Sequence, residues 1–242
     1  MEKKINVTTA QEITEILKAL GNPDKAKHLA RFFKTGKGQY GEGDLFIGIT
    51  VPEQRAIAKK YIDTDFENLS ELLRSPYHEI RLTALLIVVY KFEKTKSSDL
   101  RSQCVDFYLS HTRYINNWDL VDLTCYKLLG VWLEDKDRSQ LHNWAASGNL
   151  WEQRIAIVTC MHFIHRKDFS DFLTIADLLL HHSHDLIHKA IGWLLREVGK
   201  KDKETLVAFL STRYRTMPRT MLRYAIERFP EEERKAYLAS EI

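Results

Sequence analysis

The residues best placed to do chemistry form one short stretch, NNWDLVD at positions 116–122, which leads into the apolar segment 123–133. Asn117 is a favourable N-cap, so the stretch predicts the start of an α-helix that continues for about four turns. At about 100° per residue, Asp122 falls on the apolar face of that helix. Burying a carboxylate without partners is costly, so either cations of the fold satisfy Asp122 or it lines a cleft.

Asp119, in the same stretch, needs a separate explanation. It points away from the apolar face, and the helix macrodipole favours an acidic residue in a first turn. A purely structural role, as a satisfied acid in the core or first turn, also stays open for Asp122.

The composition is that of a folded chain: 44% of the 242 residues are apolar and 29% are charged. No run of about 18 uncharged apolar residues occurs, and the first residues lack the hydrophobic segment of a secretory signal, so we expect no membrane contact and a cytoplasmic location. Cys104, Cys125 and Cys160 show no CxxC spacing and are predicted to be buried free thiols. The net charge is only +3, so any basic binding surface must be local.

The start and stop signals predict about a dozen helices with short links and no strand. Thr9 and Thr50 each begin a capping box, and Asn22 precedes a proline at a first helical position. The glycine-rich segment 36–43 lacks the preceding strand and following helix of a phosphate-binding loop. We interpret it as a flexible loop.

A weak internal repeat places a cation at corresponding positions of successive helices. Arg81 and Arg154 lie 73 residues apart, about two repeats; Lys189 follows after 35 residues and Arg223 after a further 34. This period predicts one HEAT-like or armadillo-type domain over residues 1–242, an all-α superhelix whose second helices line a concave basic face.

Two predicted helices carry cations beside an indole ring. In segment 185–200, Trp193 lies off the apolar stripe, on the side of Lys189 and Arg196. In segment 150–166, the arc opposite the core holds Trp151, Arg154, His162, His165 and Arg166. Such faces suit a polyanion that also carries flat bases, although a solvated helical face explains any single arginine.

Three segments resemble the AlkD family of HEAT-like-repeat alkylpurine DNA glycosylases. They are WDLVD at 118–122, LWEQRIA at 150–156 and KAIGWLLRE at 189–197, and the similarity runs from about Gly21 to Arg223. The resemblance implies a monofunctional enzyme of base excision repair that removes cationic 3-alkyladenine and 7-alkylguanine from duplex DNA. It also implies a monomer that needs no metal or redox cofactor.

The resemblance assigns roles residue by residue. Asp122 matches the catalytic aspartate and Arg154 the active-site arginine, while Trp118 and Trp193 match two cleft tryptophans that bind the substrate. The predicted contacts to the DNA backbone are Lys189, Arg196, His162 and Arg166, of which His162 stands where the family has a lysine.

The chemistry explains these residue types. Alkylation already places positive charge on the purine, so charge develops on the sugar as the glycosidic bond breaks. A carboxylate near C1′ stabilises that charge, and aromatic rings add contacts to cations. Arg154 would neutralise the phosphate. The family is expected to work on the exposed sugar and backbone without a tight base pocket, unlike most glycosylases.

The chain also departs from the family pattern. Phe32 replaces a tyrosine, segment 36–43 interrupts a helix that approaches the minor groove, and Asp185 and Leu186 replace aromatic residues. Two other functions therefore stay open: a non-catalytic HEAT-like DNA-binding paralogue and a helical protein-interaction scaffold. The histidines at 181, 182, 184 and 188 are explained by a turn between helices, so no metal site is expected.

Overall fold

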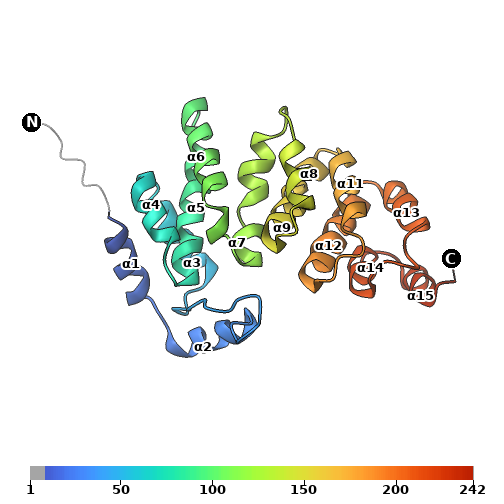
Figure 1. The fold of residues 1–242 in the computed structure, drawn as a ribbon, viewed down its shortest axis with the longest axis horizontal. Helices are drawn as coiled ribbons and strands as arrows, with labels where there is room; N and C mark the ends of the chain where they lie inside the picture. The colour runs from blue at the N-terminus through green and yellow to red at the C-terminus, as the bar shows by residue number, and fades with distance from the viewer. Residues whose placement is uncertain (1–8, 242) are drawn as a thin grey trace, which may run out of the picture. The chain divides into compact units, whose positions relative to one another are not determined.

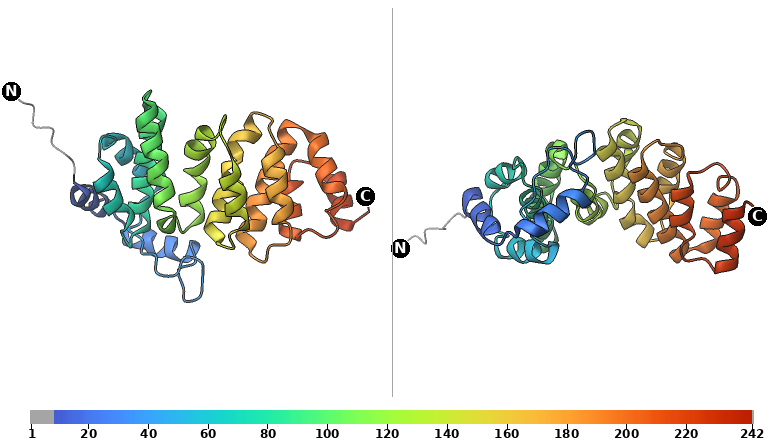
Figure 2. Two further views of the ribbon diagram at one scale, coloured as in Figure 1. Left: turned by 45° about the horizontal axis from the view of Figure 1, so that its top comes forward. Right: turned by 90° about the horizontal axis from the view of Figure 1, so that it is seen from below.

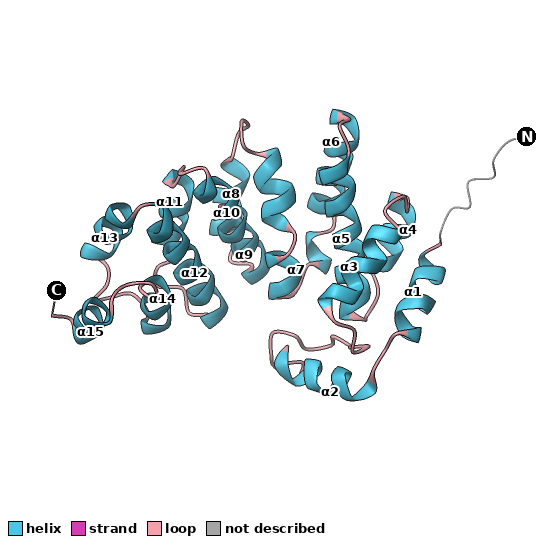
Figure 3. Ribbon diagram, turned by 180° about the vertical axis from the view of Figure 1, so that it is seen from behind, coloured by secondary structure: helices cyan, strands magenta, loops and turns pink. Residues whose placement is uncertain are grey.

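The computed structural model describes residues 9–241, which divide into two compact units. Unit 1 extends to Thr124 and unit 2 begins at Cys125. The described residues are helical throughout, apart from loops and one isolated parallel β-bridge between Leu45 and Tyr77 (Figure 3). The prediction of an all-α chain is therefore confirmed. No described helix is long and apolar enough to cross a bilayer.

Unit 1 is organised around one buried central helix (Figure 1). Its elements are α1 (Ala10–Ala19), α2 (Pro23–Phe32), α3 (Val51–Lys60), α4 (Phe66–Leu73), α5 (His78–Lys94), α6 (Ser98–Ser110), the 3-10 helix η1 (Thr112–Tyr114) and α7 (Trp118–Asp122). Helices α3, α4, α6 and α7 all pack on α5. Because α5 is surrounded, its side chains from His78 to Val89 are buried whatever their polarity.

The helix starts follow the capping signals in the sequence. Thr9 and Thr50 form the predicted capping boxes. The Asn22 side chain accepts hydrogen bonds from the backbone N–H groups of the next helix, α2, and Asn117 caps α7 by accepting from the Trp118 N–H at 2.9 Å. These local bonds satisfy donors that an uncapped first turn would leave unpaired.

The segment after Asn117 is helical over about the predicted length, but it is not one continuous α-helix. Helix α7 ends at Asp122, a turn follows, and the chain resumes as a π-helical turn, η2 (Tyr126–Gly130). The Thr124 hydroxyl donates to the Leu120 carbonyl one turn back, a bond that competes with the helical pattern and bends helices. The apolar periodicity of the segment carried no sign of this interruption.

Helix α2 lies apart from the central helices of unit 1 (Figures 1 and 2), and none of its residues is buried. The chain after it returns to the unit through backbone bonds. The Leu45 N–H donates to the Pro76 carbonyl at 3.0 Å, and the His78 N–H donates to the Leu45 carbonyl at 2.8 Å. The residues that follow the glycine-rich segment are therefore anchored to unit 1 by backbone hydrogen bonds and are not a free loop.

A buried carboxylate holds the end of this stretch. Glu79 of α5 accepts hydrogen bonds from the N–H groups of Ile47, Gly48 and Ile49 at 3.0, 2.8 and 3.4 Å. At the same place the Asn22 N–H donates to the Ile47 carbonyl at 2.9 Å. Segment 22–47, which contains α2, thus has its two ends bonded to each other, and its C-terminal end is also bonded to α5.

Gly48→Ala should destabilise unit 1 by roughly 1–3 kcal/mol more than Gly38→Ala, because a new side chain would overpack the junction. Both glycines have positive φ, +91° and +76°, so both substitutions carry backbone strain. Only at Gly48 would the new Cβ meet backbone, the Asn22 carbonyl oxygen at 2.1 Å; at Gly38 nothing lies within 4 Å. Thermal unfolding of the two variants measures the difference, and equal midpoints would contradict the packing at Gly48.

Unit 2 consists of helix pairs in which α12 is central. After η2 come α8 (Ser139–Ala146), α9 (Leu150–Thr159), α10 (Met161–His165), α11 (Ser170–Leu178), α12 (Asp185–Lys201), α13 (Lys203–Ser211), α14 (Arg219–Ala225) and α15 (Glu231–Ala239). Helices α9, α10, α13 and α14 pack on α12. The three cysteines, Cys104 in unit 1 and Cys125 and Cys160 in unit 2, are buried free thiols, as predicted.

Candidate active site

Unit 1 contains a cavity of about 850 Å³ between α2 and the N-terminal turns of α3, α5 and α7. Helix α2 contributes Leu29 and Phe32 to its lining, and the anchored stretch contributes Phe46 and residues 48–50. The predicted site residues Trp118 and Asp122 both line this cavity and are both half-buried. Asp122 thus fulfils one of the two alternatives that its apolar face predicted, a carboxylate at a cleft.

Aromatic rings form one wall of the cavity. Phe33 stacks on Trp118 on one side and on Phe46 on the other, each with ring centroids 5.1 Å apart and interplanar angles of 17° and 19°. Phe32 meets Trp118 edge-on at 5.9 Å and is itself 56% exposed. Such stacked and edge-on geometries stabilise aromatic clusters beyond their buried area, so the wall is a preformed surface.

A buried histidine, His78, also lines the cavity, next to this wall. The His78 imidazole stacks on Phe46 at 4.8 Å and contacts two carboxylates, Asp119 through Nε2 at 2.8 Å and Asp44 through Nδ1 at 3.2 Å. Burial alone would lower the pKa of His78. The charge of Asp119 and the hydrogen bonds to both carboxylates outweigh it and raise that pKa to about 9. His78 is therefore an imidazolium at neutral pH, and both ring nitrogens donate.

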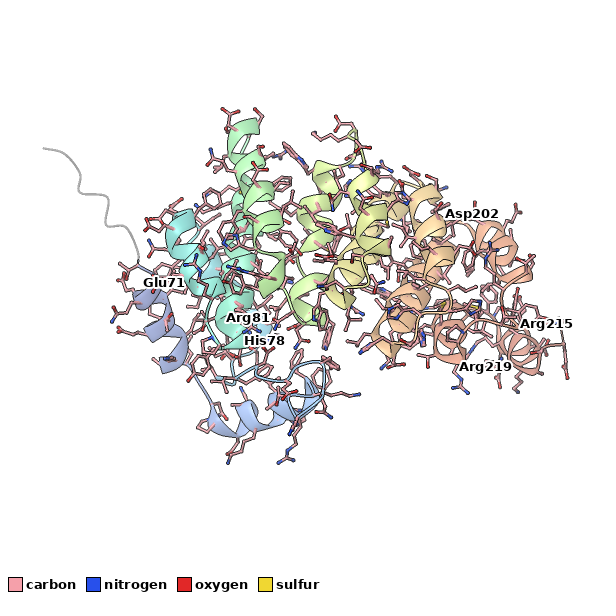
Figure 4. All side chains as sticks on the ribbon, viewed as in Figure 1. Glu71, His78, Arg81, Asp202, Arg215 and Arg219 are labelled. Atoms are coloured by element: carbon pink, nitrogen blue, oxygen red, sulfur yellow. The ribbon has the colours of Figure 1, made fainter. Side chains whose placement is uncertain are left out.

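Arg81, one turn further along α5, completes the network beside His78 (Figure 4). It donates to Asp44 at 2.7 Å, to the Asn116 side chain at 3.1 Å and to the Ser75 carbonyl at 3.0 Å. Burial would raise the pKa of Asp44, but the His78 hydrogen bond and the Arg81 charge lower it below its usual 3.8. The buried Asn117 amide also donates to Asp44, at 3.3 Å. These hydrogen bonds hold the start of α7 against α5 and so determine the position of Trp118.

Asp119 lies in the first turn of α7, as predicted, but the side of the helix that holds it is buried as well. Its side chain is buried, with 5% of the residue exposed, and accepts from His78 and from the Leu120 N–H. A helical wheel assumes that one face of a helix is covered, whereas α7 packs against α5 through the face that holds Asp119. The network of His78, Arg81 and Asp44 was missed because these polar residues lie in segments that packing, and not periodicity, buries. Its one sequence signal is a histidine and an arginine, three residues apart, ahead of the mostly apolar run 82–89.

The other predicted site residues lie in unit 2. Arg154 belongs to α9, which is buried from Gln153 to Thr159, so Arg154 is only 4% exposed and its guanidinium donates to the Leu186 carbonyl at the start of α12. Its predicted place on an exposed basic arc is wrong, because α9 has neighbours on all sides. Because its guanidinium bonds to the start of α12, Arg154 is nevertheless held in a fixed position.

Helix α12 has the predicted division of faces. Its apolar residues are buried, while Lys189, Trp193 and Arg196 are half-buried on another side. Lys189 pairs with Asp185 at 2.7 Å, and Arg196 contacts Glu197 at 3.4 Å and also Glu227. The cations beside the indole ring thus have acidic neighbours, which the wheel of a single helix could not show in full.

His162 and Arg166 share one acid. Both contact Glu134, at 3.1 Å and 2.6 Å, and the Arg166 side chain is 55% exposed. Lys189, Arg196 and Arg166 thus form partly exposed ion pairs on unit 2, and the His162 side chain, 14% exposed, contacts the same acid as Arg166. Their role on DNA stays a prediction.

The histidine-rich turn before α12 is accounted for by backbone bonds. His182 Nδ1 accepts from the His184 N–H at 3.0 Å, and His184 Nδ1 accepts from the Leu186 N–H at 3.1 Å. Within residues 9–241, no group of three or more histidine, cysteine or acidic side chains is arranged to hold a metal ion.

Comparison with known proteins identifies the family. The family model of DNA alkylation repair enzymes matches residues 13–229. The chain belongs to this family. Membership gives it a role in DNA alkylation repair, with DNA as its partner. No curated protein sequence matches the chain.

The chain is also similar in fold to a solved structure of another protein. It is described as a predicted DNA alkylation repair enzyme from Enterococcus faecalis, and it superimposes with a TM-score of 0.66 at 17% identity, over 87% of this chain and 97% of that one. The fold is accordingly the predicted all-α superhelix. The concave basic face and the single HEAT-like-repeat domain stay predictions.

Proposed function

We propose that this family member is a monofunctional DNA glycosylase that excises cationic N3- and N7-alkylated purines from duplex DNA in base excision repair. The observation that carries the proposal is the position of Asp122, beside Trp118 on the wall of an aromatic cavity in a DNA alkylation repair enzyme. The proposed reaction needs a carboxylate and aromatic surface, and unit 1 supplies both.

The reaction is hydrolysis of the glycosidic bond. The bond electrons leave with the alkylated base, which becomes neutral, and the sugar becomes an oxocarbenium ion. The Asp122 carboxylate stabilises that cation electrostatically and orients the water that adds at C1′, and the proton that this water loses passes to the solvent. The products are a free alkylated base and an abasic site. None of these reaction steps requires a metal or a redox cofactor.

Residues of unit 2 would hold the DNA. In this proposal Arg154 neutralises a phosphate, Trp193 packs against the nucleotide, and Lys189, Arg196, His162 and Arg166 contact the backbone. The cations of this last group already pair with carboxylates, but these pairs are partly exposed and such pairs contribute little stability. Exchanging an acidic neighbour for a phosphate therefore costs little.

The test is single-turnover release of 7-methylguanine and 3-methyladenine from methylated duplex DNA, together with DNA affinity across a range of salt. We expect release of both bases and an affinity that falls steeply as salt rises, because bound phosphates release counterions. Salt-dependent binding without release would favour the non-catalytic paralogue and reject the glycosylase. The absence of any salt-dependent DNA binding would favour a protein-interaction scaffold.

A further inference from the structure

We propose that the end of α2 and the turn after it, segment 27–37, bind the phosphodiester backbone of DNA, with Lys34 as the central contact. This role extends the proposed function and rests on it for DNA as the ligand. It belongs to the part of unit 1 where the chain departs from the family pattern. Three observations support it: the charge of the segment, the surroundings of its cations and the backbone conformation of Lys34.

Positive charge is concentrated in segment 23–42. This segment has five lysine or arginine residues and two acidic ones, so its net charge of +3 equals that of the whole chain. Lys27 and Arg31, four residues apart, share one face of α2, and neither lines the cavity. The turn adds Lys34 and Lys37, and all four cations are exposed. Unit 1 therefore has the local basic surface that a weakly charged chain needs to bind DNA.

The cations at the end of this segment are not paired with acids. Among residues 9–241, no ion pair joins Arg31, Lys34 or Lys37 to a carboxylate. Glu42, the acidic residue of the turn, accepts a hydrogen bond from the Gly38 N–H at 2.7 Å. The predicted DNA contacts of unit 2, by contrast, pair with carboxylates. A phosphate can therefore bind at the end of α2 without displacing an acidic side chain.

Hydrogen bonds within the turn hold its backbone in one conformation. The Gly41 N–H donates to the Lys34 carbonyl at 3.2 Å, and the Gln39 N–H donates to the Gly36 carbonyl at 3.0 Å. The Gly36 N–H in turn donates to the Gln39 side chain at 3.0 Å. At Gly41 an added Cβ would meet the Phe33 carbonyl oxygen at 2.4 Å, so the close approach requires glycine. An ordered turn loses little backbone entropy when its lysines bind a ligand.

Lys34 has a backbone conformation that is uncommon for lysine. It follows the C-cap of α2 with a φ of +53°, in the left-handed region. Its N–H donates to the Arg31 carbonyl at 3.2 Å, and the Thr35 N–H donates to the Ala30 carbonyl at 3.1 Å. These two bonds define the Schellman ending of a helix, where glycine is the usual residue because a side chain is strained. The fold alone thus favours glycine at this position, and a role for the ammonium group explains the lysine.

The test separates the charge of Lys34 from its effect on folding. Lys34→Gly relieves the strain, so it should raise the unfolding midpoint by roughly 2 °C. It should nevertheless weaken binding of a duplex that carries a tetrahydrofuran abasic-site analogue by about five- to tenfold at roughly 0.1 M salt. The slope of log affinity against log salt should become shallower by about 0.9, the value for one phosphate contact. Lys34→Arg keeps the charge and should bind within about twofold of the wild type.

The matched control is Lys167→Gly in unit 2. Lys167 also follows a helix with a positive φ, +63°, and its N–H and that of Asp168 donate to the Ile164 and Phe163 carbonyls in the same pattern. Its charge, however, acts on Asp202, whose pKa it helps to lower. The substitution should raise the unfolding midpoint in the same way and leave DNA affinity within about twofold.

Two results would overturn the surface: a Lys34→Gly variant with the affinity and salt slope of the wild type, or equal losses of affinity in Lys34→Gly and Lys167→Gly. Base release is measured separately on methylated duplex DNA. Release by a wild type whose DNA affinity Lys34→Gly leaves unchanged would overturn the surface while the glycosylase proposal stands. A salt slope that falls only in Lys34→Gly, without base release by the wild type, would support the surface and reject the glycosylase.

Discussion

Replacing Asp122 with asparagine is expected to slow single-turnover release of 7-methylguanine by about 10²–10³-fold, the effect of losing one preorganised electrostatic group. Asparagine keeps the size of the side chain but cannot stabilise a positive sugar. The loss corresponds to a barrier higher by about 3–4 kcal/mol. DNA affinity should stay within about twofold, because the carboxylate contributes to the transition state and not to phosphate binding.

The matched control is Asp24→Asn. Asp24 also lines the cavity, but from α2 and with a side chain that is 96% exposed, so its charge is screened by water. We expect its release rate to match that of the wild type. An Asp122→Asn enzyme with an unchanged rate would remove Asp122 from the mechanism, and equal losses in both variants would indicate a general effect of negative charge at the cavity.

Replacing His78 with glutamine is expected to destabilise unit 1 by about 3–5 kcal/mol, since it leaves Asp44 and Asp119 buried without their shared cation. For a chain of this length, that corresponds to a fall in the unfolding midpoint of roughly 10 °C. The matched control is His142→Gln in unit 2, which breaks a His–Asp pair whose histidine side chain is 37% exposed. Its cost should stay below about 1 kcal/mol.

The same histidine predicts how stability depends on pH. Its pKa is raised from 6.5 to about 9 in the folded protein, so the folded state binds the proton more tightly than the unfolded chain. The stabilisation is complete below pH 6.5 and is lost as pH rises through 9. By the size of this shift it amounts to roughly 3 kcal/mol. Denaturant unfolding at intervals from pH 6 to 9.5 should show this decline in the wild type and a shallower one in His78→Gln. Parallel curves for the two proteins would contradict the charged state of His78.

Local signals in the sequence were sufficient for most helix starts, although not for the end of α7 at Asp122. Capping residues such as Thr9, Asn22 and Asn117 act within one turn, so their effect does not depend on distant packing. The same holds for the amphipathic pattern of α12, whose Trp193 is half-buried off the apolar stripe as predicted. Helix periodicity also placed Asp122 on an apolar face, and in the structure Asp122 lines the aromatic cavity.

Burial of polar groups could not be read from one helix at a time. Arg154 was expected on an exposed arc and is buried, because α9 is covered on every side. Asp119 was expected in a first helical turn, away from the apolar face, and nothing in its own helix predicted its contact with His78 of α5, 41 residues earlier in the chain. A wheel describes one helix, whereas the environment of a side chain depends on every helix that packs around it.

The sequence by itself determined the all-α class, most helix starts, the family and the prominence of Trp118 and Asp122, because each depends on residues within a few turns of one another. Tertiary structure alone decided that α2 bounds a cavity, that Asp122 and Trp118 line it, and that His78 is charged. These properties arise where segments far apart in the chain meet. Desolvation and hydrogen bonding between them act through space, and a pattern along one segment carries no record of them.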